Sequence, residues 1–229
     1  MLNFAKKGKT FVTSDTHWHH APKWENPIWK MRGHSSPKEH DDFIVSETNR
    51  RVGKDDDLIH LGDLCLNSKI EDFEQLIASI NCQNIYMLWG NHPNPHYKRV
   101  YLPLVKTLLG NSYVEGMEVY PLRYKNVIYL GHYAEVILEG QYTVLSHYPI
   151  YIWNEMQHGA WMLCGHSHYG CELSRAETMT GKILDVGWDG HKSVWTLEEI
   201  RAVMDKKQIA VVDHHRPDAP RTPVVAEKG

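Results

Sequence analysis

The stretch Trp161-Met162-Leu163-Cys164-Gly165-His166-Ser167-His168 shows the pattern that decides the fold: a short apolar run ends at a small residue, and metal-binding side chains follow. The pattern recurs four times: Phe11-Val12 precedes Asp15 and His17, Leu58-Ile59-His60-Leu61 precedes Asp63, Ile85 to Trp89 precedes Asn91 and His92, and Tyr142 to Leu145 precedes His147. Short apolar runs bounded by glycine or serine are typical of buried strands. The sequence therefore predicts five strands that each deliver polar side chains at their carboxyl ends.

Helical patterns lie between these runs. Apolar residues over 70–80 recur at the spacing of one buried helix face. Weaker patterns predict helices over 41–52, within 98–109 and from Thr196, whose hydroxyl can cap the first turn. Strands that alternate with helices predict a largely parallel sheet. Short strand candidates between glycines over 112–146 indicate antiparallel hairpins instead.

The fold class that follows is α/β, with mixed β-sheets in one domain over residues 1–212. The tail over 213–229 is rich in proline and charge and is expected to be flexible. With 229 residues, of which 42% are hydrophobic and 23% charged, the chain has the composition of an ordinary globular domain.

Composition also excludes several classes of protein. No apolar run approaches the ~20 residues that cross a bilayer, and the N-terminus lacks the apolar stretch of a secretory signal. The four cysteines form no C-x-x-C pair, which favours free thiols and a cytoplasmic location. A net charge of −3 without a long basic block argues against extended binding to duplex nucleic acid. The oligomeric state stays open.

Side chains that follow the ends of neighbouring strands gather at one edge of an open sheet. The predicted cluster consists of Asp15, His17, Asp63, Asn91, His92, His147, His166 and His168. Asp63 has two carboxylate oxygens and is placed to bridge two cations. Glycines at 62, 90 and 165 allow the backbone to approach closely where these side chains crowd together.

These donors predict two divalent transition-metal ions as cofactors. Carboxylate, amide and imidazole groups suit manganese, iron, zinc or nickel better than calcium. Asp15 and Asp63 supply two negative charges against the four positive charges of two divalent ions, so positive charge remains to attract a phosphate. Two ions about 3.5–4 Å apart can generate hydroxide and hold the oxygens of an in-line displacement at phosphorus.

In order along the chain, Asp15-Thr16-His17, Gly62-Asp63, Gly90-Asn91-His92, His147 and Gly165-His166-Ser167-His168 resemble the five motifs of the calcineurin-like metallophosphoesterase family. The resemblance covers residues 11–168, and Asp185-Val186-Gly187 resembles the family's usual ending. Each motif alone is weak, but five in order, each after a strand, are specific. Compact bacterial and bacteriophage members are the most similar.

The resemblance implies a four-layer α/β/β/α sandwich, in which two mixed β-sheets are flanked by helices. It also implies how the ligands divide. One metal is expected to bind Asp15, His17 and His168, and the other to bind Asn91, His147 and His166, with Asp63 as the bridge.

His92 is similar to a histidine of the family that binds no metal and that either protonates the leaving group or contacts the phosphoryl oxygens. The resemblance therefore makes His92 the candidate catalytic residue. The family usually has an acidic residue directly after this histidine, and here that position is Pro93. An acid would orient the imidazole and raise its basicity. With proline in place of the acidic residue, the reaction rate and the range of leaving groups stay open.

The expected function is that of a metallophosphoesterase. Metal-bound hydroxide would attack phosphorus in a small phosphomonoester or phosphodiester, of nucleotide or cyclic-nucleotide type. A nuclease or an RNA- or DNA-end phosphatase is the alternative enzyme. A metal-binding scaffold without catalysis is the alternative outside the enzymes, and it is disfavoured because all seven ligand positions are filled.

The loop over 18–37 contains Trp18, Trp24 and Trp29 among several prolines. It is interpreted either as a small aromatic core or as a lid that stacks on a nucleobase. Trp18 and His20 are the candidate substrate contacts, because both follow the first motif.

Other chemistry-bearing residues receive structural interpretations. Tyr148 and Trp153 either form a wall of the site or pack in the core, and Cys164 and Cys171 are interpreted as core and loop thiols. His60 lies inside a strand and is expected to pack. Histidines outside the motifs are expected at the surface: His19, His34, His40, His96, His158, His191, His214 and His215.

Overall fold

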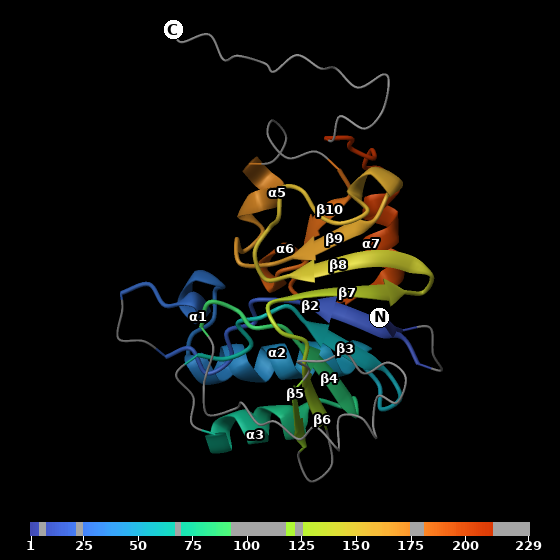
Figure 1. Ribbon diagram of the computed structural model, residues 1–229. Coiled ribbons are helices and arrows are strands. Elements are labelled where there is room, and N and C mark those ends of the chain that lie inside the picture. Colours follow the sequence, from blue (N-terminus) through green and yellow to red (C-terminus); the bar gives the residue numbers. More distant parts are fainter. Residues whose placement is uncertain are drawn as a thin grey trace, which may run out of the picture.

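The computed structural model describes residues 1–4, 8–21, 25–66, 70–92, 118–121, 126–174 and 181–212, and its strands form two mixed sheets. Sheet A has the strand order β1-β7-β8-β9-β10, and sheet B has the order β11-β2-β3-β4-β6-β5 (Figure 1). Sheet A consists of β1 (Leu2–Asn3), β7 (Tyr133–Leu138), β8 (Gln141–Ser146), β9 (Trp161–Cys164) and β10 (Ile183–Asp185). Sheet B consists of β2 (Thr10–Thr13), β3 (Asp57–His60), β4 (Asn84–Met87), β5 (Glu118–Pro121), β6 (Asn126–Tyr129) and β11 (Trp195–Thr196). The α/β fold class is confirmed.

Strand direction and register bring the predicted motifs to one end of the molecule. In sheet B, β2, β3 and β4 are parallel, and Thr13, His60 and Met87 lie side by side at their carboxyl ends. In sheet A, β8 and β9 are parallel, with Leu145 beside Leu163. All five predicted strands are therefore present, but they are divided between two sheets.

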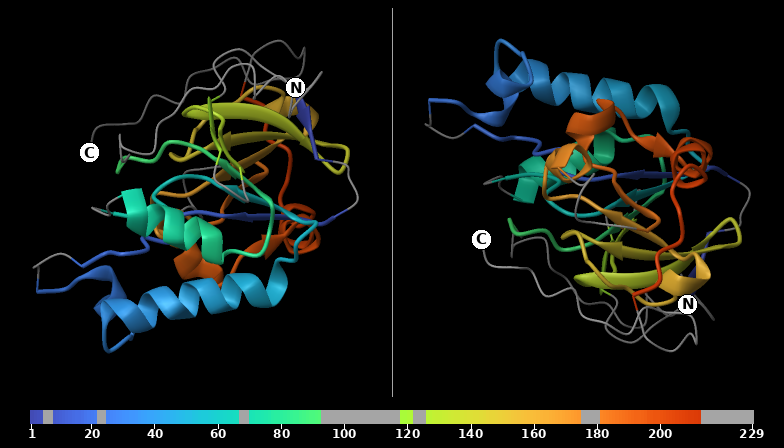
Figure 2. Two further views of the ribbon diagram at one scale, coloured as in Figure 1. Left: turned by 90° about the horizontal axis from the view of Figure 1, so that it is seen from below. Right: turned by 90° about the horizontal axis from the view of Figure 1, so that it is seen from above.

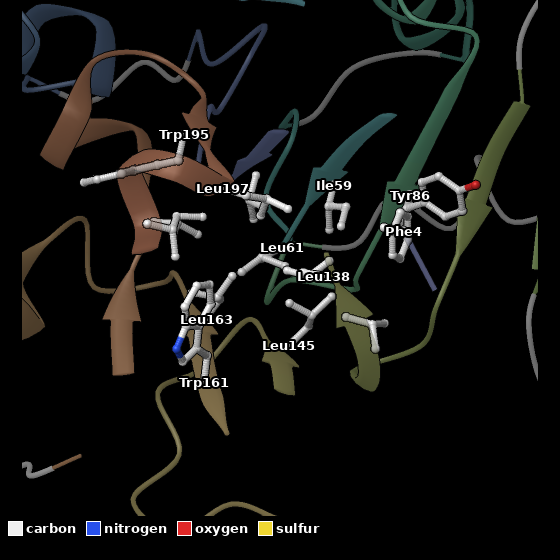
Figure 3. Packing of buried hydrophobic residues seen from close by; sticks show 14 of the residues in the cluster. Phe4, Ile59, Leu61, Tyr86, Leu138, Leu145, Trp161, Leu163, Trp195 and Leu197 are labelled. Atoms are coloured by element: carbon white, nitrogen blue, oxygen red, sulfur yellow. The ribbon is translucent and has the colours of Figure 1, made fainter. Parts of the chain in front are cut away.

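The two sheets share one apolar core. Ile59 of β3 and Leu61 after it face Leu145 of β8 and Leu163 of β9 across the space between the sheets (Figure 3). Each of these side chains is fully buried, as expected for short apolar runs that alternate with turn residues. This packing fixes the distance between the strand ends of sheet A and those of sheet B.

Helices cover the other face of sheet B. The long helices are α2 (Pro37–Arg51) and α3 (Ile70–Ser79), which lie side by side over the strands in the view from below (Figure 2). Ile44 of α2 and Leu76 of α3 pack against Phe11 and Leu58 of sheet B. On the outer face of sheet A, Trp153 and the 3₁₀ helix η3 (Met156–His158) pack against β8 and β9.

The shorter helices lie at the ends and the side of the sandwich. They are α1 (Ile28–Met31), α5 (Gly170–Ser174), α6 (Trp188–His191) and α7 (Leu197–Met204). In Figure 1, α1 and α5 lie at the end to which β8 and β9 point. Helix α7 contacts β10 of sheet A and β2 and β11 of sheet B, so it closes one side of the core.

The predicted helix boundaries hold in two cases and fail in one. Helix α3 occupies the predicted range, and α7 begins after Thr196, which forms a capping box with Glu199. Helix α2 begins at Pro37 rather than at 41, because Ser36 accepts a hydrogen bond from the Glu39 N–H and proline is preorganised for a first helical turn. The prediction within 98–109 lies outside the described residues.

The antiparallel hairpins predicted over 112–146 are confirmed where the chain is described, as β5 pairs antiparallel with β6 and β7 with β8. The predicted tail over 213–229 lies outside the described residues. All four cysteines are free thiols. Among the described residues, no helix has both the length and the apolar character that a membrane span requires.

Candidate metal centre

The predicted ligands converge from both sheets at the end of the sandwich. Asp15, Asp63 and Asn91 follow strands of sheet B, whereas His147, His166 and His168 follow strands of sheet A. Within sheet B, Asp15 N–H donates to the Gly62 carbonyl and His17 N–H donates to the Asp63 carbonyl, each at 3.0 Å. Between the sheets, the His166 N–H donates to Asp15 Oδ2 at 2.7 Å. The joint between the sheets therefore carries the candidate site.

One group of ligand atoms belongs to Asp15, His17 and His168, whose donor atoms lie within 4.8 Å of one another. The rings of His17 and His168 stack with their centroids 5.0 Å apart. Burial, followed by repulsion from His168, lowers the pKa of His17 well below its usual range. His17 is therefore neutral and offers a lone pair, which is the form that binds a metal.

Asp63 stands between this group and the next. Its Oδ2 lies 3.9 Å from His17 Nε2 and 3.5 Å from His147 Nε2. Its Oδ1 accepts the His92 N–H at 3.0 Å, which fixes the carboxylate plane. A carboxylate oxygen between two imidazole nitrogens supports the predicted bridge. Asp15 also comes within 4.8 Å of Asp63 and His147, so both carboxylates lie at the centre.

The second group gathers around Asn91. Its Oδ1 lies 2.7 Å from His147 Nε2 and 2.9 Å from His166 Nδ1. His147 Nδ1 lies 3.0 Å from the Leu61 carbonyl, which can only accept, so the Nδ1–H donates there. The Nε2 lone pair then faces two oxygens, of Asn91 and Asp63. A cation at this point would satisfy all three atoms.

Two glycines make this crowding possible. A Cβ on Gly90 would lie 1.9 Å from Asp63 Oδ1, and a Cβ on Gly165 would lie 2.3 Å from Asp15 Oδ2. The carboxylates thus occupy the volume that any other residue at 90 or 165 would fill. This agrees with the close approach that the sequence predicts for these glycines.

Asp185 shapes the loop that carries His166 and His168. Its Oδ2 accepts hydrogen bonds from the Ser167 hydroxyl and from the Tyr169 N–H, and its Oδ1 accepts from the Gly187 N–H at 2.8 Å. Asp185 is fully buried. The residues that resemble the family's usual ending therefore hold the last ligand loop in place.

Arg32, Asp189 and His40 also belong to the site, and the sequence did not single them out for it. His168 Nδ1 donates to Asp189 Oδ2 at 2.7 Å, which leaves Nε2 for a metal. Burial opposes the ionisation of Asp189, but hydrogen bonds from Arg32 and His168 outweigh it and hold its pKa well below its usual range. Fully buried His40, predicted at the surface, contacts Arg32, so that prediction is wrong.

His92 lies at the exposed side of the predicted ligands. Its side chain is exposed at the site, and its ring centroid lies 6.0 Å from that of His17. The backbone of His92 is held by Asp63, as described above. Pro93 lies outside the described residues, and the effect of a proline after His92 stays open.

The two candidate substrate contacts differ in position. His20 is buried with its ring 5.7 Å from that of His17, and burial lowers its pKa to about 4, so it would meet a substrate as a neutral group. Trp18 packs against the core between sheet B and its helices, which supports the structural interpretation of this residue. Tyr148 is exposed beside His147 and His166, whereas Trp153 is buried and donates to the Ala160 carbonyl.

Three buried atoms test whether a metal fits these residues. Asp15 Oδ1 and both ring nitrogens of His17 have no hydrogen-bond partner. A buried polar atom without a partner costs about 1–3 kcal/mol, and burial raises the pKa of Asp15 to about 6. One cation would satisfy the carboxylate oxygen and an imidazole nitrogen together. The residues therefore fit divalent transition-metal ions.

The comparisons with known proteins concern the fold. No family model matches the chain, and no curated protein matches it in sequence. A solved structure, described as a protein of unknown function, AQ665, from Aquifex aeolicus, is similar with a TM-score of 0.54 and 19% sequence identity. The similarity covers 86% of this chain and 100% of that one. At this identity, the likeness supports the arrangement of the two sheets.

Proposed function

We propose that this chain is a calcineurin-like metallophosphoesterase that hydrolyses small phosphomonoesters or phosphodiesters of nucleotide type. One observation carries the proposal: Asp15 Oδ1 and His17 Nε2, which are buried without a hydrogen-bond partner, lie together with His147 Nε2 around the Asp63 carboxylate where the two sheets meet. The residues that would hold one ion are Asp15, His17 and His168, and those for the other are Asn91, His147 and His166. When bound, two such ions polarise a phosphoryl group and activate water.

The chain's own residues bind and orient the substrate. Asp15 and Asp63 carry the only two formal charges among the seven predicted ligands, so a loaded site would attract an anionic phosphate. His92 stands at the exposed side of these ligands with its backbone fixed by Asp63. Its imidazole is the group that would protonate the departing oxygen. We also assign the protein to the cytoplasm, since its four cysteines are free thiols.

The test is hydrolysis by the purified full chain. Metal-free protein is supplied with Mn²⁺ and assayed with nitrophenyl phosphate, its diester analogue and nucleoside monophosphates. We expect turnover that depends on Mn²⁺ and that chelation abolishes. The variant Asp42→Asn changes an exposed carboxylate on α2 and is the matched control for changes at the site. Absence of turnover with any divalent transition metal, while the metal binds, would favour the non-catalytic scaffold.

A further inference from the structure

The guanidinium of Arg32 lies inside the loops that carry the predicted ligands, and its side chain is 7% exposed. Arg32 follows α1 in the loop over 18–37. Its Nε and Nη2 donate to the two oxygens of Asp189 at 2.8 and 2.7 Å. The second Nη2 hydrogen is directed to the Asp15 carbonyl at 2.7 Å. Nη1 donates to the Thr16 carbonyl at 2.7 Å and lies 3.0 Å from His40 Nε2.

A guanidinium has five N–H donors, and each donor of Arg32 has an acceptor. His40 Nδ1 lies 3.2 Å from Asp41 Oδ1, which can only accept, so the proton is on Nδ1 and Nε2 accepts from Arg32. A lysine in this position would offer three donors without the planar fork. The arrangement therefore requires arginine.

These contacts connect two ligands of the same predicted ion. On one side, Arg32 holds the carbonyl of Asp15, a residue with a positive φ of 56°. On the other side, Arg32 orients Asp189, which in turn accepts the Nδ1–H of His168 at 2.7 Å. One side chain thus fixes the backbone of Asp15 and the ring of His168.

We propose that Arg32 is a positioning residue that sets the affinity of the metal site formed by Asp15, His17 and His168. The inference rests on the proposed function, since it concerns the same ions. Within the described part of the chain, Arg32 makes no such contact with the second site, where Asn91 and His147 contact His166, Asp63 and Leu61. Loss of Arg32 should therefore weaken one site and leave the other.

Arg51 provides a matched control. Its Nη2 donates to Glu199 at 2.7 Å and its Nη1 to the Val194 carbonyl at 2.7 Å, with a side chain that is 16% exposed. Like Arg32, Arg51 donates both to a carboxylate and to a backbone carbonyl of residues distant from it in sequence. Neither Glu199 nor Val194 is a predicted ligand. Arg51→Ala therefore measures how the loss of a partly buried arginine changes folding stability without a change at the metal site.

The experiment titrates Mn²⁺ into the metal-free full chain and follows it by electron paramagnetic resonance, with thermal unfolding recorded for each variant. The wild type is expected to show a spin-coupled manganese pair. Arg32→Ala and Arg32→Lys are expected to keep an isolated ion at the site of Asn91, His147 and His166, and to bind Mn²⁺ about 10–100-fold more weakly at the site of Asp15, His17 and His168. Arg51→Ala should lower the unfolding temperature and keep the pair. Excess Mn²⁺ should partly restore the activity of Arg32→Lys, which a folding defect would not allow.

Three results would overturn the proposal: a manganese pair of unchanged affinity in both Arg32 variants, equal loss of the pair in Arg51→Ala, or no manganese bound by the wild type. If Arg32→Ala does not fold, Arg32→Lys and Asp189→Asn test the same contact with less change in volume. A wild type that binds the pair without hydrolysing any ester would contradict the proposed function, and the role of Arg32 in metal binding would remain.

Discussion

Most of the predicted ligands have a backbone conformation that is uncommon for residues other than glycine. Asp15, His17, Asp63, His166 and His168 have φ values between 50° and 67°. Left-handed conformations of this kind cost about 1–3 kcal/mol each and persist where surrounding contacts hold them. Here the strand ends and interlocked loops supply those contacts. These conformations turn side chains from separate strands toward one small volume, as the proposed metal centre requires.

The bridging role of Asp63 gives the first prediction. Asp63→Asn keeps the side-chain size but removes a negative charge between the imidazoles of His17 and His147. We expect the bound metal to fall below two ions per chain and the turnover to drop by about 10²-fold or more, as expected when a metal cofactor is lost. Elemental analysis and nitrophenyl phosphate hydrolysis measure the two effects. Two bound metals and near-normal turnover would refute the dinuclear site.

The position of His92 gives the second prediction. A general acid contributes about 10²–10⁴-fold in rate, mainly where the leaving oxygen is strongly basic. His92→Ala should therefore retain both metals, lose most activity on nucleotide esters and lose far less on nitrophenyl esters. The measurement is kcat for both substrates, with metal content determined in each protein.

The exposed His158 on η3 supplies the control for that comparison, as His158→Ala should change neither rate. An equal loss on both substrates in His92→Ala would mean that His92 contacts the phosphoryl oxygens and does not donate a proton.

At the level of helices and strands, the sequence predicted the elements that are determined by interactions between residues close in sequence. Apolar runs predicted β2, β3, β4, β8 and β9, because a buried strand can be recognised from the hydrophobicity of its own residues. The start of α2 was missed although Ser36-Pro37 carries the signal of an N-cap and a first helical residue. The pairing of Arg32 with Asp189 could not be predicted, since 157 positions separate them in sequence.

The loop after β4 gives the third prediction. A Cβ on Gly90 would lie 2.6 Å from the Asp63 backbone nitrogen, so the two loops must separate in Gly90→Ala. We expect a stability loss of about 1–3 kcal/mol and weakened Mn²⁺ binding. Gly170→Ala is the control, since among the described residues its Cβ would meet only the Ser167 Cβ at 3.9 Å. Denaturant unfolding and Mn²⁺ titration measure both effects, and equal behaviour of the two variants would contradict the crowding argument.

The capping box of α7 gives the fourth prediction. Thr196→Ala removes the hydroxyl that accepts the Glu199 N–H at 3.1 Å. A lost N-cap costs about 1 kcal/mol of stability. Because α7 closes the side of the core, thermal unfolding should report this loss, while Mn²⁺ affinity stays unchanged. A fall in metal affinity would show that α7 is coupled to the site.

At the scale of the whole molecule, two sheets contribute ligands to one site because they share one core. The sequence predicted the mixed sheets and the convergence of strand ends, since strands that alternate with helices favour parallel pairing, and the carboxyl ends of parallel strands meet at one edge. It did not predict that α7 contacts strands of both sheets, because that arrangement depends on the packing of Trp195, Leu197 and Ile200 against distant residues.

The overall charge gives the fifth prediction. Because the chain has a net charge of −3, the binding of a phosphorylated substrate should depend on the proposed metal centre alone. Its affinity should therefore change little with the salt concentration. For a single strand held through many phosphates, the logarithm of the binding constant would fall against the logarithm of the salt concentration with a slope of about −0.7 per neutralised phosphate. We expect the KM of a nucleoside monophosphate to change little between low and physiological salt. A steep loss of affinity for long single strands, together with their cleavage, would favour the nuclease.

The central claim is that seven side chains from two sheets hold two metal ions. Diffraction from crystals grown with Mn²⁺, recorded at the manganese absorption edge, tests it most directly. We expect two anomalous peaks, one beside Asp15, His17 and His168 and one beside His147, with Asp63 in contact with both. Crystals with full manganese occupancy elsewhere and no anomalous peak between Asp15 and His147 would contradict it.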